Sequence, residues 1–251
     1  MKPVEVLFTP AEFAALAERN LQSTTCVVFD VLRATSTMVT ALANGASAVR
    51  PVEDIADALT WRQQQPEVLL AGERGGLRIT AAQTGGVDFD LGNSPREFTP
   101  EVVAGKTIIA TTTNGTRALK SCASARVLLV GAFLNLTATA NAIMSQPTDE
   151  LLLVCSGTGD GAALEDTLAA GALADLLEAK GFPLADSAQI SREVYLRLVG
   201  NLAGAMVLSR NGARLLAYPE LREDVALCLR RDVFDLVAGM ESDGCVRRLK
   251  S

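Results

Sequence analysis

Short apolar runs alternate with helix-period segments along the first 185 residues, and this alternation constrains the fold most strongly. Residues 26–31 and 151–155 are short and apolar, as buried strands are. Residues 35–44 and 163–180 instead carry apolar side chains at helical spacing. The repeated strand–helix units predict an α/β fold, with a mostly parallel sheet and helices on both of its faces.

The same pattern gives bounds for the individual elements. We expect strands over residues 4–8, 26–31, 48–52, 68–71, 106–110, 127–131 and 151–155. We expect helices over residues 11–20, 35–44, 54–64, 115–122, 137–145 and 163–180. Residues 76–100 show no clear periodicity, so we expect a long loop with one short strand there. Such loops are often functional.

The last part of the chain shows only a helical pattern. One face is marked by Tyr195, Val199, Leu202 and Met206, and another by Val225, Leu229, Val233, Leu236 and Met240. We therefore expect a helical C-terminal region. The chain is interpreted as one domain, 1–251, which can be subdivided into an α/β part, 1–185, and a helical part, 186–251.

The composition excludes several classes of function. The chain contains no histidine, which rules out a Ser-His-Asp or Cys-His catalytic site and any zinc site that uses imidazole. Proton transfer and metal binding would fall to carboxylates, hydroxyls, lysine or cysteine. The formal net charge is −6 and aromatic residues make up 4% of the chain, so we expect no nucleic-acid partner.

The cysteines and the hydropathy bear on location. The five cysteines form no C-x-x-C motif, and no apolar run is long enough to span a bilayer. We expect a reduced, cytoplasmic protein with buried thiols and no membrane partner. The sequence leaves the oligomeric state open, a homo-oligomer included.

Polar and ionisable residues follow five of the expected strands. Ligands of open α/β sheets bind beyond the carboxyl ends of the strands, so the loops at 30–37, 72–76, 111–117, 133–135 and 156–161 are expected to meet in one cleft. Asp30 offers Mg²⁺ a hard oxygen ligand, although it could instead cap a helix and pair with Arg33. The charged pair Glu73 and Arg74 lies between glycines that allow close approach to a ligand, although it could equally form a solvated turn.

The sequence T-T-T-N-G-T-R at 111–117 is the strongest indication of an anion site. It lies between a strand and a helix, where unpaired N–H groups and hydroxyls can bind phosphate. Arg117 would add a forked cation on the first helical turn. The alternative is that the threonines are strand formers and Asn114 only caps the helix.

Residues near the end of the last expected strand carry weaker signals. Ser156–Gly161 lacks the lysine of a phosphate loop. Glu165 and Asp166 are adjacent on a helix and diverge by about 100°, so one could bind a metal while the other orients a neighbour. Cys155 lacks the arginine of a cysteine-phosphatase cradle, so it is interpreted as a small buried hydrophobe.

Five motifs together resemble the 2-phosphosulfolactate phosphatase family over nearly the whole chain. They are D-V-L-R-A-T at 30–35, G-E-R-G-G at 72–76, D-L-G-N-S-P at 90–95, T-T-T-N-G-T-R-A at 111–118, and G-T followed by L-E-D-T at 164–167. The resemblance implies an α/β, Mg²⁺-dependent phosphatase that hydrolyses 2-phospho-3-sulfolactate, a step toward coenzyme M.

The resemblance also implies a site. Its metal ligands would be Asp30, Glu73, Glu165 and Asp166, with Asp30, Glu73 and Asp166 as the catalytic carboxylates. The anionic substrate would be bound by Arg33, Arg74, Asn93, Ser94, Thr112, Thr113, Asn114, Gly115, Thr116 and Arg117, with Arg96 in reserve. Two rivals remain: a binding or regulatory protein for a small phosphorylated metabolite, and an acyl hydrolase that uses Ser94 or Cys155.

Overall fold

A ten-stranded sheet forms the centre of the computed structural model, which describes residues 2–146 and 148–250. The strands are β1 (Glu5–Leu7), β2 (Thr24–Phe29), β3 (Ala48–Pro51), β4 (Leu69–Arg74), β5 (Leu77–Arg78), β6 (Thr107–Thr111), β7 (Val127–Gly131), β8 (Glu150–Cys155), β9 (Val237–Met240) and β10 (Val246–Leu249).

The helices are spread along the whole chain. The α-helices are α1 (Pro10–Ala14), α2 (Ala34–Ala43), α3 (Ile55–Gln64), α4 (Ala81–Thr84), α5 (Pro100–Val103), α6 (Gly115–Ser121), α7 (Leu136–Met144), α8 (Leu164–Glu178), α9 (Asp186–Leu198), α10 (Leu202–Ala205), α11 (Arg210–Ala217) and α12 (Arg222–Cys228). Single 3₁₀ turns are η1 (Ala15–Glu18), η2 (Pro95–Glu97), η3 (Phe133–Asn135), η4 (Val199–Asn201) and η5 (Pro219–Leu221).

The sheet consists of two parallel halves that a hairpin joins. The strand order is β1-β8-β2-β7-β9-β10-β3-β6-β4-β5. Strands β1, β8, β2 and β7 are parallel, as are β3, β6 and β4. The C-terminal hairpin β9–β10 runs antiparallel between β7 and β3. The predicted α/β class with a mostly parallel sheet is confirmed.

Each central strand packs against helices on both faces. Every residue of β2 is buried, as expected for a parallel strand covered on both sides. Val27 and Phe29 pack with residues of α7 and α8, whereas Cys26 and Val28 pack with α2 and α6. A third apolar cluster lies under α3. The two faces fix the register of the strands, so the loops at their ends emerge at defined places.

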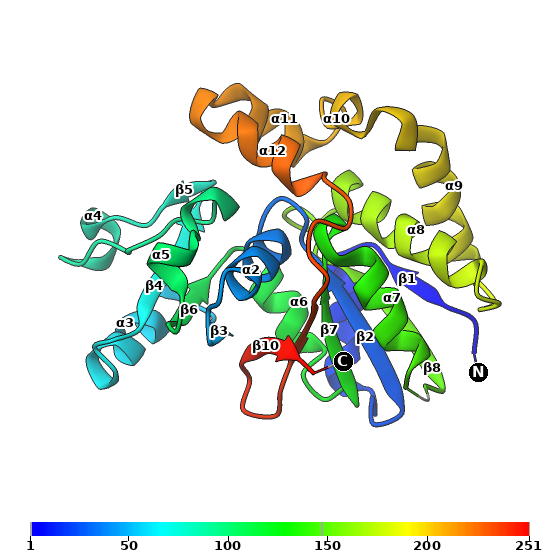
Figure 1. Cartoon of the computed structure of the whole chain (residues 1–251), viewed down its shortest axis with the longest axis horizontal. Helices are drawn as coiled ribbons and strands as arrows, with labels where there is room; N and C mark the ends of the chain where they lie inside the picture. The colour runs from blue at the N-terminus through cyan, green and yellow to red at the C-terminus, as the bar shows by residue number, and fades with distance from the viewer. Residues whose placement is uncertain (1, 147, 251) are drawn as a thin grey trace.

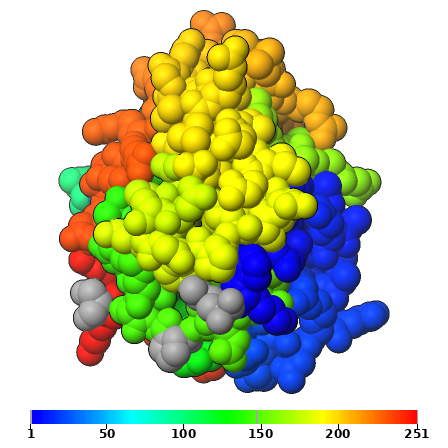
Figure 2. Space-filling model, turned by 90° about the vertical axis from the view of Figure 1, so that its right-hand side faces the viewer, coloured from blue at the N-terminus to red at the C-terminus, as the bar shows by residue number. Residues whose placement is uncertain are grey.

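Helix α9 covers the outer edge of the sheet. The Val6 N–H donates to the Ser187 hydroxyl at 2.9 Å, and the Ala185 N–H donates to the Val4 carbonyl at 2.9 Å. In Figure 2 the α9 region lies across the middle of the face, above the first residues of the chain. Covering an edge strand in this way blocks pairing with another chain. No helix within 2–146 and 148–250 is both long and apolar enough to cross a membrane.

The predicted helical C-terminal region is confirmed over residues 186–228, but the prediction that only helices follow residue 186 is wrong at the C-terminus. Helix α12 ends at Cys228, and residues 237–249 form the hairpin in the middle of the sheet. Asp232 has a φ of 51° and accepts hydrogen bonds from the N–H and hydroxyl of Thr137, at 2.6 and 2.9 Å. This left-handed residue lies in the connection between α12 and β9, where apolar residues continue at helical spacing although the backbone is no longer helical.

Two further expectations need correction. The single helix expected through Tyr195 and Met206 is interrupted after Leu198, because Asn201 turns its side-chain oxygen to the Gly204 N–H and begins the short helix α10. The long loop at 76–100 contains the expected short strand, β5, and also carries α4 and η2.

Figure 1 shows where the C-terminal helices lie. Helices α10, α11 and α12 cross the top of the molecule, over the ends of the central strands, whereas α3 and α4 lie to one side. The loops that follow β2, β4, β6 and β8 therefore come to lie beneath α11.

Candidate active site

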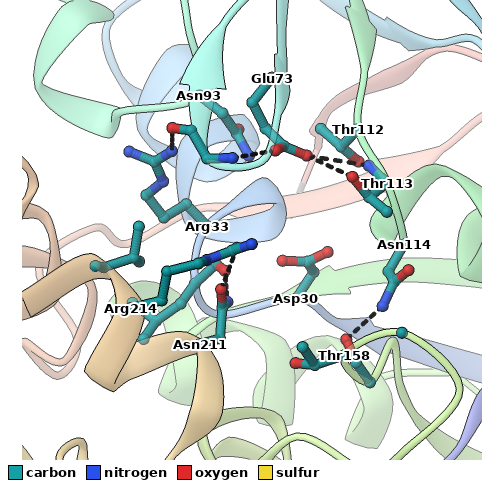
Figure 3. A pocket seen from close by; sticks show the side chains of 15 residues that line it. Asp30, Arg33, Glu73, Asn93, Thr112, Thr113, Asn114, Thr158, Asn211 and Arg214 are labelled. Atoms are coloured by element: carbon teal, nitrogen blue, oxygen red, sulfur yellow. Dashed lines mark hydrogen bonds between the residues drawn. The ribbon is translucent and has the colours of Figure 1, made fainter. Parts of the chain in front are cut away.

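One cavity collects the strand-end loops, with a volume of about 100 Å³. At roughly 10–15 Å³ for each water, this equals the space of some seven to ten water molecules, which suits a small metabolite. Its walls come from the loops after β2, β4, β6 and β8, from Asn93 and from helix α11 (Figure 3). The lining residues are Asp30, Leu32, Arg33, Glu73, Gly76, Asn93, Thr112, Thr113, Asn114, Gly157, Thr158, Gly159, Asn211, Arg214 and Leu215.

Four of the five expected loops meet here, and the fifth does not. Residues 133–135 after β7 are fully buried elsewhere. Asn135 accepts a hydrogen bond from the Ala132 N–H at 2.9 Å and donates to the Val130 carbonyl at 3.2 Å. The segment before β9 covers this loop, since the Phe234 N–H bonds to the Leu134 carbonyl at 2.9 Å.

Asp30 lies at the centre of the cavity, directly after β2 (Figure 3). Its Oδ1 accepts a hydrogen bond from the Ala34 N–H at 3.1 Å, so it caps α2 as one alternative proposed, but Arg33 does not pair with it. Gly115 is required beside it, because an added Cβ would lie 2.8 Å from Asp30 Oδ2. Burial raises the pKa of Asp30 to about 7. The hydrogen bond from Ala34 lowers this pKa, whereas the negative charges of Glu73 and Glu165 raise it further.

Glu73 joins two walls of the cavity and does not form a solvated turn. Its side chain is 7% exposed. One carboxylate oxygen accepts from the Gly76 N–H at 2.7 Å, and the other from the N–H and hydroxyl of Thr113, at 3.2 and 2.9 Å. Glu73 therefore holds the β4–β5 turn against the threonine loop.

The threonine loop presents Thr112, Thr113 and Asn114 to the cavity. Asn114 precedes α6 but makes no capping bond with its side chain. Its Nδ2 donates to the Gly157 carbonyl at 2.7 Å, while its buried Oδ1 has no hydrogen-bond partner among the described residues. An unpaired buried oxygen at a cavity wall can accept a hydrogen bond from a ligand or can bind a cation. Gly115 and Thr116 lie behind this wall and are buried.

Glu165 and Asp166, at the start of α8, do not line the cavity. Asp166 accepts from the Val31 N–H at 2.8 Å and the Gly157 N–H at 3.1 Å, so it ties together the loops after β2 and β8. Burial, with the neighbouring charge of Asp30, raises the pKa of Asp166 well above its ordinary value. Glu165 accepts a hydrogen bond from the Ser209 hydroxyl. Within 2–146 and 148–250, no three acidic or cysteine side chains are grouped to hold a metal.

The three predicted substrate arginines have different surroundings. Arg33 lines the cavity but is 3% exposed and forms an ion pair with Asp224 at 2.6 Å. Arg74 is not among the lining residues, and donates to the Glu73 carbonyl at 2.7 Å and to the Thr111 hydroxyl at 3.2 Å. Arg117 is exposed and likewise does not line the cavity.

The D-L-G-N-S-P motif is divided between the cavity and a buried contact. Asn93 lines the cavity. Ser94 donates to Asp224 at 2.6 Å, and Arg96 donates to the same carboxylate at 2.7 Å. Asp224 is fully buried on α12 and receives hydrogen bonds from three side chains in two segments of the chain, Arg33 and residues 94–96. Ser94 and Arg96 are thus engaged in holding α12 in place.

Cys155, the alternative nucleophile, is fully buried and does not line the cavity. Burial raises the pKa of its thiol well above the ordinary value, with a contribution from the charge of Asp166. A neutral buried thiol is a poor nucleophile, which agrees with its interpretation as a core residue.

The sequence analysis missed the contribution of α11. Asn211 and Arg214 lie on one side of this helix and face the cavity (Figure 3). The Arg214 Nη2 donates to Asn211 Oδ1 at 2.6 Å, and Asn211 Nδ2 bonds to the Leu32 carbonyl. The spacing of three residues between an amide and a cation was the only available signal, and it is common on solvated helices.

The fold and the cavity place the chain among α/β proteins that bind a small ligand at the carboxyl edge of the sheet. The profile of the 2-phosphosulpholactate phosphatase family matches residues 12–243. Relatives named "Probable 2-phosphosulfolactate phosphatase" support this match. The protein from Caldicellulosiruptor saccharolyticus is 37% identical over 92% of this chain and 95% of its own length.

Two further relatives carry the same name. The protein from Caldanaerobacter subterraneus is 39% identical over 96% of this chain and 97% of its own length. The protein from Thermotoga petrophila is 41% identical over 85% of this chain and 87% of its own length. The chain therefore belongs to the 2-phosphosulfolactate phosphatase family, and with that family it is a phosphoric monoester hydrolase.

Proposed function

We propose that the protein is a Mg²⁺-dependent phosphatase that hydrolyses 2-phospho-3-sulfolactate, or a similar 2-phospho-hydroxyacid, to the hydroxyacid and phosphate. The observation that carries the proposal is the meeting of Asp30 with the threonine loop in one small cavity, in a chain of this family. The size of the cavity favours a substrate of this kind over a nucleotide.

Asp30 supports the metal part of the proposal. Its carboxylate faces the cavity, and burial makes its negative charge costly unless a cation lies beside it. Mg²⁺ needs only one or two carboxylates, together with waters and substrate oxygens, so a three-carboxylate cluster is not required. Asp30 would hold the ion, and the unpaired Asn114 Oδ1 would add an oxygen at the same wall. Bound there, Mg²⁺ would offset charge on the phosphoryl and leaving-group oxygens and acidify water.

The other predicted carboxylates support the site from behind. Glu73 accepts the N–H and hydroxyl hydrogen bonds of Thr113 and so holds the loop in place, which leaves the Thr112 hydroxyl to bind a phosphoryl oxygen without rearrangement of the loop. Asp166 holds the loops after β2 and β8 together. Preorganised donors stabilise developing charge more effectively than donors that must reorient.

Phosphate release from 2-phospho-3-sulfolactate tests the proposal. We expect release with Mg²⁺, loss of release in EDTA, and recovery when excess Mg²⁺ is added back. Undiminished release in EDTA would refute the metal requirement while leaving the phosphatase assignment intact. Thermal stabilisation by the ester without phosphate release would instead favour a binding or regulatory protein.

A further inference from the structure

Helix α11 brings a cation into the cavity from the side opposite the threonine loop. In Figure 3, the Arg214 side chain extends from this helix toward the centre of the cavity, where Asp30 lies between it and Asn114. Arg214 and Asp30 form no salt bridge with each other. The two sides of the cavity thus offer different groups: hydroxyls, amides and a carboxylate on one side, and a guanidinium on the other.

The Arg214 guanidinium is held in position by a chain of hydrogen bonds. It donates to Asn211, whose own side-chain N–H₂ group bonds to the Leu32 carbonyl in the loop after β2. The helix itself is fixed at its start, where the Ser209 hydroxyl accepts from the Gly212 N–H at 3.0 Å and donates to the buried Glu165. An arginine oriented in this way loses less freedom when it binds an anion.

Arg214 also differs from the other cation of the cavity in its charge balance. Arg33 is neutralised by Asp224 at 2.6 Å and also donates to the Gly76 carbonyl at 2.5 Å. In the part of the chain that the structure describes, Arg214 pairs with no carboxylate, and it donates to the neutral amide of Asn211. Its positive charge is therefore available to a ligand, whereas that of Arg33 is not.

We propose that Arg214, oriented by Asn211, binds the acid group of the substrate that is not phosphorylated, a carboxylate or a sulfonate. This deepens the proposed function and rests on it. The forked guanidinium matches the oxygen pairs of both acids. The phosphate would then lie on the Asp30 and Thr113 side, and the small cavity brings both ends of one molecule within reach. Arg214 selects phosphate esters of hydroxy acids over simple phosphate esters.

Kinetics with substrates that keep or lack the second acid group test this proposal. Arg214→Gln should lower kcat/KM for 2-phospho-3-sulfolactate by about 30-fold or more, as for loss of a charge partner. The loss should lie mainly in KM, because the charge of this acid group does not change during hydrolysis. Hydrolysis of p-nitrophenyl phosphate, which lacks the group, should change by less than about threefold.

Matched variants separate recognition from folding. Arg214→Lys keeps the charge without the fork, so its loss should be intermediate. Arg197→Gln removes the same charge from the exposed side of α9 and should leave both substrates unaffected. The thermal midpoint of Arg214→Gln should stay within about 2 °C of that of the wild type, since the side chain is exposed.

Two substrates with one acid group each identify the group that Arg214 binds. Arg214→Gln should retain its effect either on 2-phospholactate, which has only the carboxylate, or on the phosphate ester of isethionate, which has only the sulfonate. An equal loss on p-nitrophenyl phosphate, or no loss on any substrate, would overturn the proposal while phosphate release by the wild type still supported the phosphatase. Absence of release by the wild type would refute the phosphatase itself.

Binding of the product gives a readout that does not depend on turnover. We expect calorimetry to show that Arg214→Gln weakens binding of 3-sulfolactate by about tenfold or more. Binding of inorganic phosphate should be unchanged, because phosphate occupies the opposite side. Weakened binding of both ligands to the same extent would contradict a separate acid subsite.

Discussion

The strand-end loops of residues 30–159 and the C-terminal segment 186–250 both line the cavity, but they supply different things. The loops place Asp30, Thr112 and Thr113 where parallel strands end, so the topology of the sheet positions them. The C-terminal segment instead lies across these loops, and supplies Arg214 to the cavity and Asp224 to the residues behind it. The comparison teaches that residues of the sequence motifs, such as Arg33 and Ser94, can serve to hold in place a C-terminal segment that carries no motif.

The strand-end side of this comparison depends most on Asp30, where we expect the largest effect. Asp30→Asn should lower kcat/KM by at least about 100-fold, because it removes the charge of the proposed metal ligand at the centre of the cavity. The fold should survive, since the amide oxygen can still accept from the Ala34 N–H. Phosphate release and circular dichroism measure the two outcomes.

Asp160→Asn is the matched control for Asp30. It makes the same acid-to-amide change at an exposed position of the loop after β8, outside the cavity lining. Its activity should stay within about threefold of the wild type. Wild-type Mg²⁺ dependence in Asp30→Asn would exclude Asp30 as a ligand.

The C-terminal side of the comparison depends on Asp224. Asp224→Asn should destabilise the protein by about 3–5 kcal/mol, because it leaves Arg33 buried without a counter-charge. For a chain of this size the melting temperature should fall by about 6–20 °C. Calorimetry and urea unfolding measure the loss.

Glu223 offers a neighbouring control on the same helix. Its side chain is 76% exposed and pairs with Arg96 at the surface, so Glu223→Gln should cost less than about 1 kcal/mol. Equal stability of the two variants would mean that Asp224 does not secure the C-terminal segment to the strand-end loops.

How much of this site the sequence could predict follows from where each partner lies. Asp30 and Thr113 were predictable neighbours, because the ends of parallel strands meet at one edge of a sheet. The role of Ser94 was not predictable, since its partner Asp224 lies 130 residues further on and belongs to no motif. Roles that depend on one long-range contact leave no periodic signal in a single sequence.

The fold shows the same division. The main strand–helix units up to residue 180 were predicted because short apolar runs alternate there with segments of helical spacing, whereas the short helix α5 (Pro100–Val103) was not predicted. The β9–β10 hairpin was not predicted, because Val233, Leu236 and Met240 fit helical spacing as well as they fit short strands. The left-handed backbone of Asp232, in the connection between α12 and β9, is accompanied by hydrogen bonds from Thr137 to its side chain, a long-range contact that the sequence does not reveal.

The pH dependence of stability should also distinguish the strand-end loops, which carry Asp30, from the C-terminal segment. We expect this effect to be smaller than that of Asp224→Asn. Burial raises the pKa of Asp30 from 3.8 to about 7, so the folded protein binds this proton more tightly than the unfolded chain. Stability from Asp30 is then full below about pH 4 and is lost as the pH rises to about 7, by at most about 1.4 kcal/mol per pH unit. Urea unfolding in EDTA at about pH 5 and about pH 8 measures this loss.

Asp30→Asn isolates this contribution from that of Asp166, whose raised pKa acts in the same direction. The variant should lose less stability than the wild type between the two pH values. Added Mg²⁺ should reduce the loss in the wild type only, because a cation favours the charged carboxylate. Identical pH profiles for the variant and the wild type would show that Asp30 does not titrate in this range.

Cys155 should give the smallest effect, although it directly precedes a loop that lines the cavity. Cys155→Ser replaces a fully buried thiol by a hydroxyl, so it should cost about 1–3 kcal/mol of stability unless the hydroxyl finds a hydrogen-bond partner. Phosphate release should stay within about threefold of the wild type, because the thiol is buried behind the cavity and burial keeps it protonated. Phosphate release is measured beside the melting temperature, with Cys228→Ser, another fully buried thiol, as the control for the cost of the hydroxyl. Complete loss of activity in Cys155→Ser alone, at unchanged stability, would point to covalent catalysis through sulfur and would contradict a site built from Asp30 and the threonine loop.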